Sequence, residues 1–561
     1  MQRSHSFERE DKKGRKIKMK EEEPMKKITA LLLACLMMVP CWLAGCGGGS
    51  TNTNDNANVA PEDRVLHMRT TSALLSTDWQ ASTLTDDMKI LWVHVFEGLY
   101  GMDEANGGYF NLLAKDIAVS EDGLTYTVTL QDATFQNGDP LTAEDVVFSY
   151  KLAMENSRFN YVTSFISDIT AQDEKTVVFT LDYPYSAIAH TFWTIKVVSQ
   201  REYNEIVASG KEFGTEPHTA GTGPYILTEF DANFVKLKAY DGYWRGAPDI
   251  KNVEYRVITE NAAAVIAFKN GELDYFTDVP LTDWESVKAA SGENNAMLKA
   301  NDIHWLGINY LSPTNNNILG NEKVREAIFW AINKDDCITA ATAGYGSPAY
   351  EYMPSEYVAT SPNYRDGKFA TYDYAPDKAH QCLLDAGFTE EQIASGIDVG
   401  TILTYGDASL PKGKECVVIQ ANLAACGMKA EVETGDYSAV GPRMYSQDYD
   451  MAIFADSGNY DYNNIRQQVD SESVGMYVVR FKDDKSPFDW QKMEELVDAG
   501  VATADTKERY DIYTELWSMV MDTKTIYPIL HTGVGVAWSQ NINVPDVPPL
   551  YYHIEKMTWA N

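Results

Sequence analysis

Residues 124–130 read Leu-Thr-Tyr-Thr-Val-Thr-Leu, and residues 137–149 read Asn-Gly-Asp-Pro-Leu-Thr-Ala-Glu-Asp-Val-Val-Phe-Ser. Apolar residues alternate with threonines in the first segment, which predicts a half-buried strand. The second segment begins with an Asn-Gly turn pair. Thr142 then predicts a helix N-cap, because two carboxylates follow it in the first turn, where the helix dipole favours negative charge. A strand, a turn and a helix are therefore expected in close succession.

The rest of the chain continues this alternation between strand and helix patterns. The predicted strands are 225–230, 235–240, 428–433 and 449–454, and the predicted helices are 324–332, 376–386 and 415–426. The last of these strands ends at Ala455-Asp456. At 561 residues the chain exceeds one ordinary domain, so we expect a mixed α/β fold in more than one lobe.

A secretory signal begins at Met25, where two lysines precede an apolar run that ends in Leu43-Ala44-Gly45-Cys46. The run contains a proline and is shorter than the roughly 20 residues of a membrane span. Leu-Ala-Gly-Cys resembles the lipobox of bacterial lipoproteins. We therefore expect a lipoprotein signal peptide over 25–45, cleavage before Cys46 and lipidation of Cys46. Residues 1–24 fit no signal pattern and are interpreted as an over-called extension, and residues 46–61 as a flexible linker.

Composition excludes several classes of function. The chain has 81 Asp and Glu against 47 Lys and Arg, a net charge of −34, which argues against nucleic-acid binding. No HExxH, GxSxG or clustered Cys and His motif occurs, so we expect no metal site, no cofactor and no catalytic residues, and the protein is not expected to be an enzyme. Four cysteines lie in predicted helices and are expected to be buried free thiols: Cys337, Cys382, Cys416 and Cys426.

Further motifs follow one another in a fixed order. They are Val95-Phe-Glu-Gly-Leu-Tyr100, Val119–Tyr126 running into Asn137–Ser149, Gly221-Thr-Gly-Pro-Tyr225 followed by Tyr243-Trp244, and Val324–Asn333. In order and spacing they resemble the oligopeptide- and dipeptide-binding lipoproteins of bacterial ABC importers, the extracellular solute-binding proteins of family 5. The resemblance extends from about residue 65 to the last residues. Gly221 and Gly223 are expected to adopt backbone angles that side chains forbid.

The resemblance implies a two-lobed periplasmic-binding-protein type II fold with an additional inserted domain and a hinge between the lobes. Lobe I would comprise residues 62–100, 210–300 and 523–561, the inserted domain 101–209, and lobe II 301–522. It also implies a monomer that captures peptides outside the cell and delivers them to an ABC transporter permease. The protein would be held on the cell membrane through Cys46, facing the extracellular or periplasmic side.

The same resemblance points to a ligand site. In peptide-binding relatives, an aspartate that follows an aromatic and a small residue pairs with the α-amine of the peptide, and Phe454-Ala455-Asp456 fits this pattern. The relatives usually continue with Tyr-Pro-Asp-Pro, whereas this chain continues with Ser457–Tyr462. Asp461 therefore remains an alternative anchor. Tyr460 and Trp305, together with Phe454, are candidate aromatic residues of the site.

Alternatives remain open from the sequence. The same fold could bind a nickel chelate, haem or an oligosaccharide, or it could act as a ligand sensor. Arg443 and Arg466 are candidates for a ligand carboxylate, although surface ion pairs are the simpler interpretation of both. A surface hydrolase has no supporting motif.

Overall fold

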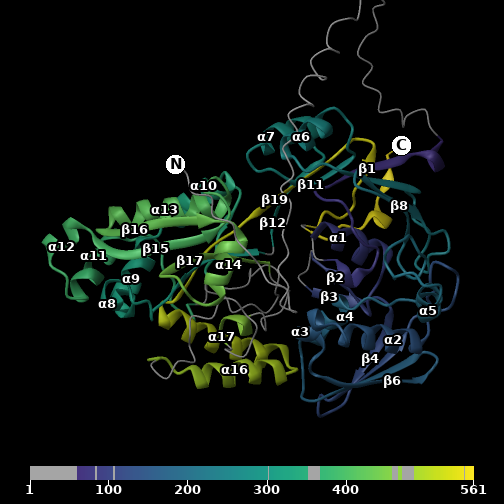
Figure 1. Cartoon of the computed structure of the whole chain (residues 1–561), viewed down its shortest axis with the longest axis horizontal. Coiled ribbons are helices and arrows are strands. Elements are labelled where there is room, and N and C mark those ends of the chain that lie inside the picture. The colour runs from purple at the N-terminus through teal and green to yellow at the C-terminus, as the bar shows by residue number, and fades with distance from the viewer. Residues whose placement is uncertain are drawn as a thin grey trace, which may run out of the picture. The chain divides into compact units, whose positions relative to one another are not determined.

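The computed structural model describes residues 60–82, 85–104, 108–300, 302–351, 367–457, 465–469, 486–548 and 550–560. The predicted signal peptide, Cys46, Tyr460 and Asp461 lie outside these ranges. The described residues form three larger sheets flanked by helices (Figure 1), which is the mixed α/β architecture expected.

The first sheet has seven strands. In order across the sheet they are β12 (Asn295–Lys299), β19 (Gly533–Trp538), β11 (Tyr275–Val279), β1 (Val65–Thr70), β10 (Asn252–Val257), β9 (Phe234–Ala239) and β8 (Tyr225–Phe230). The predicted pair β8 and β9 is antiparallel, as expected. Strand β1 runs parallel to both β10 and β11, so the carboxyl ends of these three strands lie at one edge.

The second sheet has six strands. Their order is β14 (Ser347–Pro348), β18 (Ile526–His531), β13 (Asp302–Ile308), β17 (Met451–Ser457), β15 (Ile397–Tyr405) and β16 (Met428–Gly435). Strand β15 is parallel to β16 and β17, and helix α13 (Pro411–Ala425) connects β15 to β16. This helix begins four residues before the predicted start, because a proline fits its first position.

The third sheet confirms the strand, turn and helix read from residues 124–149. Its order is β4 (Ala114–Val119), β5 (Thr125–Leu130), β7 (Thr176–Leu181) and β6 (Ile166–Asp173). Gly138 has a φ of 88° in the predicted turn. Thr142 caps helix α2 (Ala143–Met154) by accepting a hydrogen bond from Asp145 N, and Asp145 completes a capping box.

The remaining helices and four short strands complete the described fold. The remaining helices are α1 (Thr85–Ile90), α3 (Asn160–Thr163), α4 (Ile188–Thr194), α5 (Gln200–Ala208), α6 (Asn261–Lys269), α7 (Trp284–Ser291), α8 (Thr314–Asn317), α9 (Glu322–Ala331), α10 (Lys334–Thr342), α11 (Pro376–Asp385), α12 (Glu390–Ser395), α14 (Tyr437–Tyr445), α15 (Arg466–Val469), α16 (Trp490–Ala502) and α17 (Thr506–Thr523). The short strands are β2 (Tyr100–Asp103), β3 (Gly108–Asn111), β20 (Ile542–Asn543) and β21 (Thr558–Trp559). Among the described helices, none has both the length and the apolar character of a bilayer span.

Separate hydrophobic cores support the sheets. One core belongs to the six-stranded sheet and its helices, whereas a second core joins the four-stranded sheet to much of the seven-stranded sheet. Four cysteines were predicted to be buried free thiols, and the structure confirms this state for Cys337, Cys382, Cys416 and Cys426. The lobe boundaries given above remain a prediction. Because β18 pairs with β13, we propose that lobe II extends to His531.

Two connections join the seven-stranded and six-stranded sheets, one between β12 and β13 and the other between β18 and β19. They are hydrogen-bonded to each other, because Ala300 N donates to Thr532 O at 2.9 Å. The Asp302 carboxylate also accepts bonds from Thr532 N at 2.8 Å and from Thr532 Oγ1 at 2.6 Å. The connections therefore form one paired crossing.

Three of the sequence motifs meet at Glu97, which is 3 % exposed. Its carboxylate accepts hydrogen bonds from Tyr243 Oη at 2.7 Å and from Trp244 Nε1 at 3.0 Å. Burial raises the pKa of Glu97 to about 7. The third motif is the segment that begins at Gly221, and Gly221 and Gly223 pack against the backbone of His94 and Val95. The buried carboxylate therefore lies where distant parts of the chain meet.

Gly221 and Gly223 were expected to adopt backbone angles that side chains forbid, and this expectation was wrong. Neither Gly221 nor Gly223 has a positive φ. A Cβ atom at Gly221 would lie 2.1 Å from Val95 O, and one at Gly223 would lie 2.5 Å from His94 O. Close approach of two backbones therefore requires glycine at both positions.

Candidate ligand-binding site

The carboxyl ends of three parallel strands meet at one edge of the six-stranded sheet. Strand β15 ends at Tyr405, which pairs in register with Gly435 at the end of β16. Strand β17 lies on the other side of β15, with Ala452 in register with Leu403. In α/β sheets, ligands bind outside the carboxyl ends of strands. This edge is therefore the candidate site, and it carries Asp456.

Asp456 is held by a tryptophan from the neighbouring strand. Trp305 on β13 donates a hydrogen bond from Nε1 to Asp456 Oδ2 at 2.9 Å. The Trp305 ring stacks on Phe454, with ring centroids 4.4 Å apart and planes at 20°. The antiparallel pairing of β13 and β17 produces this arrangement, because it places Trp305 opposite Phe454 and Ile303 opposite Asp456.

The structure thus brings together three of the predicted site residues. Asp456 lies within the last residues of β17 rather than after its end, because pairing with β13 continues to Ser457. Trp305 and Phe454 are 0 % and 1 % exposed, so in this structure they support the carboxylate. Their direct contact with a ligand, and that of Ala455, remains a prediction. Tyr460 and Asp461 lie outside the described residues.

The sequence reasoning missed four residues around the end of β15, the strand next to the one that carries Asp456. Tyr405 ends β15, and its ring contacts Tyr437 edge-on at 5.2 Å. Tyr437 is 52 % exposed, and Leu410 before α13 is 51 % exposed. Lys412 places its Nζ 3.1 Å from the centroid of the Tyr405 ring. Exposed large apolar side chains beside a strand end are a signal of a binding surface, but only once the strands have been paired.

Charges in this region are closely coupled. Glu415 is fully buried on α13, and its Oε1 lies 2.6 Å from His304 Nδ1. Burial lowers the pKa of His304, but the Glu415 carboxylate outweighs this effect, so the pKa is raised overall. Burial lowers the pKa of Lys412 to about 8, despite the opposing effects of Glu415 and Asp456. The edge therefore combines the buried pair of His304 and Glu415 with the ammonium of Lys412 and the carboxylate of Asp456.

The seven-stranded sheet has a comparable edge. Asp278, near the end of β11, has a φ of 54° beside an irregularity in the pairing with β19. Its Oδ2 accepts a hydrogen bond from Lys89 Nζ at 2.5 Å, and Asp86 accepts bonds from Thr71 N and Oγ1 at 2.7 and 2.5 Å. A positive φ in a non-glycine residue next to a bulge is a local strain that clusters at functional sites. This edge is a second candidate for ligand contact.

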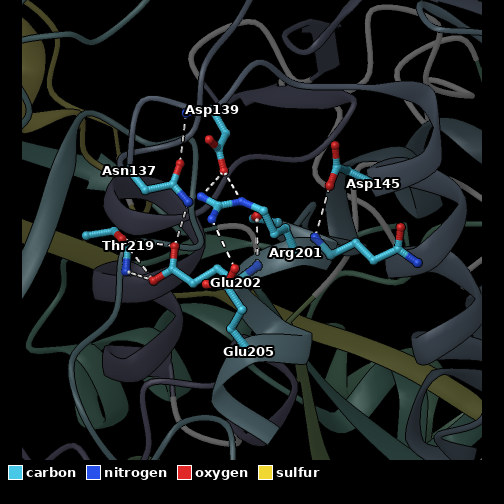
Figure 2. Close-up of polar contacts among 9 residues, drawn as sticks. Asn137, Asp139, Asp145, Arg201, Glu202, Glu205 and Thr219 are labelled. Carbon is cyan, nitrogen blue, oxygen red and sulfur yellow. Dashed lines mark hydrogen bonds and ion pairs between the residues drawn. The ribbon is translucent and has the colours of Figure 1, made fainter. Parts of the chain in front are cut away.

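A cavity of about 450 Å³ beside α5 is a weaker candidate. Figure 2 shows that its polar side chains bind one another. Glu202 accepts hydrogen bonds from Asn137 Nδ2 and Thr219 Oγ1, both at 2.8 Å, and Arg201 Nε donates to Asp139 at 2.7 Å. Asn137 and Asp139 of the family motif therefore bind Glu202 and Arg201 on α5. This role is structural.

Other predicted groups have structural partners as well. Arg443 pairs with Glu433 at 2.5 Å and with Asp448 at 3.3 Å, and Arg466 pairs with Asp498 at 2.8 Å. These contacts agree with the interpretation of both arginines as surface ion pairs. Within the described ranges, no group of three or more His, Cys, Asp or Glu side chains is arranged to hold a metal ion.

Comparison with known proteins gives consistent matches. The profile of the bacterial extracellular solute-binding proteins, family 5 (middle region), matches residues 109–469. The glutathione-binding protein GsiB of Escherichia coli O1:K1 / APEC is 30 % identical over 356 residues, which cover 61 % of this chain and 64 % of that protein. The chain thus matches less than two thirds of the length of these curated relatives.

Solved structures resemble the chain over most of its length. HbpA2 from Haemophilus parasuis has a TM-score of 0.77 at 22 % identity, and NikA from Brucella suis in complex with Fe(III)-EDTA has a TM-score of 0.76 at 19 % identity. Each match covers 89 % of this chain and 100 % of the other. At these identities the likeness shows the fold.

Proposed function

The chain belongs to the bacterial extracellular solute-binding proteins of family 5, and from this membership we propose that it captures peptides by their α-amine at Asp456. It has the two-lobed α/β fold of these binding proteins, as predicted. Solute-binding proteins of this family are not enzymes, so the function to be explained is recognition of a solute.

One observation carries the proposal. The Asp456 carboxylate is held by Trp305 Nε1 at 2.9 Å, at the edge where three parallel strands end. A carboxylate fixed in this way makes a charge-assisted bond to an ammonium group, and such bonds are about twice as strong as neutral ones. The α-amine is common to all free peptides, so this contact is independent of side chains. Pairing of an extended peptide with strand edges would supply further affinity that does not depend on sequence.

The relatives support a small peptide as the solute. GsiB is named for glutathione, which is a tripeptide, and it is 30 % identical to this chain over 356 residues. We extend the proposal to transport: the loaded protein would dock, as a monomer, on the permease of an ABC importer.

We also propose that Cys46 is lipidated after removal of residues 25–45. The acyl chains would hold the protein on the outer face of the cytoplasmic membrane, and more than one chain is needed for stable anchoring. Metabolic labelling with a radioactive fatty acid tests this point. A Cys46→Ser variant should lose the label and leave the membrane fraction.

Calorimetry of the purified protein with a defined peptide tests the role of Asp456. Asp456→Asn should lower affinity about 10- to 100-fold, because a hydrogen bond to a charged group contributes roughly 1.5–3 kcal/mol. Asp448→Asn is the matched control, since Asp448 is an exposed carboxylate that pairs with Arg443. Peptide binding that survives both Asp456→Asn and Asp461→Asn would refute amine anchoring.

Other cargoes are outcomes of the same experiment. A nickel chelate, haem or an oligosaccharide lacks a peptide α-amine, so its binding should not depend on Asp456. Mass spectrometry of a solute that copurifies with the protein would identify such a ligand directly. A sensor role would appear as binding without uptake in a strain that carries the permease.

A further inference from the structure

Lys412 occupies an unfavourable position in the fold. It is the second residue of α13, a helix of 15 residues. The amino end of a helix carries positive partial charge, so a cation there is repelled. No acidic residue lies in the first turn of α13 to offset this repulsion. A residue that breaks a local rule is a candidate for function.

The ammonium of Lys412 has no acceptor in the described part of the chain. Its contact there is the face of the Tyr405 ring, with the ring centroid 3.1 Å from Nζ. A cation over a ring gains about 0.5–2 kcal/mol, but this contact does not satisfy the three N–H donors of an ammonium. Lys412 is half-buried, so its donors are also partly removed from water. A group in this state favours the arrival of an anionic acceptor.

Lys412 and Asp456 face the same edge without pairing. Tyr405, beneath the ammonium, ends β15, and Asp456 lies near the end of the adjacent strand β17. Burial lowers the pKa of Lys412, and the Glu415 carboxylate and, more weakly, Asp456 oppose this effect, so both carboxylates attract the ammonium. Lys412 and Asp456 nevertheless form no ion pair within 4.0 Å among the described residues. A positive and a negative group, separated at one edge, are complementary to a ligand that carries both charges.

We propose that Lys412 binds a carboxylate of the ligand, and that Lys412 and Asp456 together select a ligand end on which one carbon atom carries both an ammonium and a carboxylate. This inference rests on the proposed function, because it takes Asp456 as the site of the amine. The first residue of an ordinary peptide has lost its α-carboxylate to the peptide bond. A free amino acid, or a glutamate joined through its γ-carboxyl, retains both groups.

Two isomeric dipeptides test the inference. We expect γ-Glu-Gly to bind the wild-type protein about 10-fold or more tighter than α-Glu-Gly in calorimetry at pH 7, because one added charge-assisted bond has this magnitude. Lys412→Met should abolish the preference, and Lys412→Arg should retain it. Lys414→Met, two residues along the same helix, is the matched control and should also retain it.

Other outcomes separate the two proposals. Wild-type protein without a preference for the γ-linked isomer overturns the inference, as does a Lys412→Met variant that weakens both isomers equally. If Asp456→Asn leaves the binding of α-Glu-Gly unchanged, amine anchoring at Asp456 fails whatever Lys412 does. If Asp456→Asn weakens both isomers while Lys412→Met affects neither, the proposed function stands and only the role of Lys412 is lost.

Discussion

Glu97 and Asp456 are both carboxylates that accept a hydrogen bond from a tryptophan indole, yet they belong to very different surroundings. Trp244 Nε1 lies 3.0 Å from Glu97, and Trp305 Nε1 lies 2.9 Å from Asp456. Glu97 is 3 % exposed, and a second buried donor, Tyr243, binds its other oxygen. Asp456 is half-buried at a strand end.

The contrast separates motifs that hold the fold from residues that we propose bind the ligand. The motifs that identify the family meet at paired polar groups, as at Glu97 and at Glu202 on α5. The edge around Asp456 instead contains exposed apolar side chains and, within the described residues, an ammonium without an acceptor. The same kind of donor, a tryptophan indole, thus fixes a buried carboxylate in one region and a half-buried carboxylate at a strand end in the other.

The largest effect should come from Glu97→Ala. The change leaves the buried Tyr243 hydroxyl and the half-buried Trp244 indole without an acceptor, and each such loss costs roughly 1–3 kcal/mol. We expect the free energy of unfolding to fall by about 3 kcal/mol in urea titrations at pH 6. Asp456→Asn should change it by less than about 1 kcal/mol. Equal losses in the two variants would contradict the contrast.

The pH dependence of stability should distinguish the two carboxylates next. The folded pKa of Glu97 is about 7, above its ordinary value of 4.5. The unfolded chain therefore loses this proton first, and the associated stability, fully present below pH 4.5, declines as the pH rises towards 7. Relative to Glu97→Gln, the wild-type protein should lose on the order of 2 kcal/mol between pH 4.5 and 7.5. A constant difference across this range would show that Glu97 does not titrate in this way.

A matched pair of tryptophan variants gives a smaller effect. Trp244→Phe and Trp305→Phe each remove one indole donor and keep an aromatic ring. Trp244→Phe should lower stability by about 1–2 kcal/mol and leave peptide affinity unchanged. Trp305→Phe should weaken peptide binding about 10-fold through loss of the bond to Asp456. Thermal unfolding measures the stability of both variants, and calorimetry measures their affinity for peptide. Loss of affinity in Trp244→Phe, with loss of stability in Trp305→Phe, would contradict the assigned roles.

Lys412→Met should have the smallest effect on stability. It removes a cation from the amino end of α13 and also removes the contact with the Tyr405 ring, and these contributions are of similar size and opposite sign. We expect the free energy of unfolding to change by less than about 0.5 kcal/mol. A loss above 2 kcal/mol would make Lys412 a structural residue and remove the reason to assign it to binding.

Local patterns in the sequence were sufficient for much of the fold. The alternation at 125–130 and the cap at Thr142 act within a few residues, and both were confirmed. Asp456 could be selected as a site residue because its neighbours Phe454 and Ala455 are adjacent in sequence.

Contacts between distant segments could not be read in the same way. The bond from Trp305 to Asp456 joins residues 151 positions apart and depends on the register of β13 and β17. Lys412 reaches the site only because β15 and β17 are adjacent and parallel. The requirement for glycine at 221 likewise comes from Val95 O, a backbone atom more than a hundred residues away, so the predicted reason was wrong.

The paired crossing between the two larger sheets has a thermodynamic consequence. Ala300, Asp302 and Thr532 bind the two connections to each other, so a rotation of one sheet against the other would turn both connections as one ribbon. The bonds between the connections would persist, and the motion would be absorbed by a few backbone torsions near them. The connections would therefore contribute little to the free-energy difference between open and closed states. That difference would be set instead by the contacts that a ligand makes in each state.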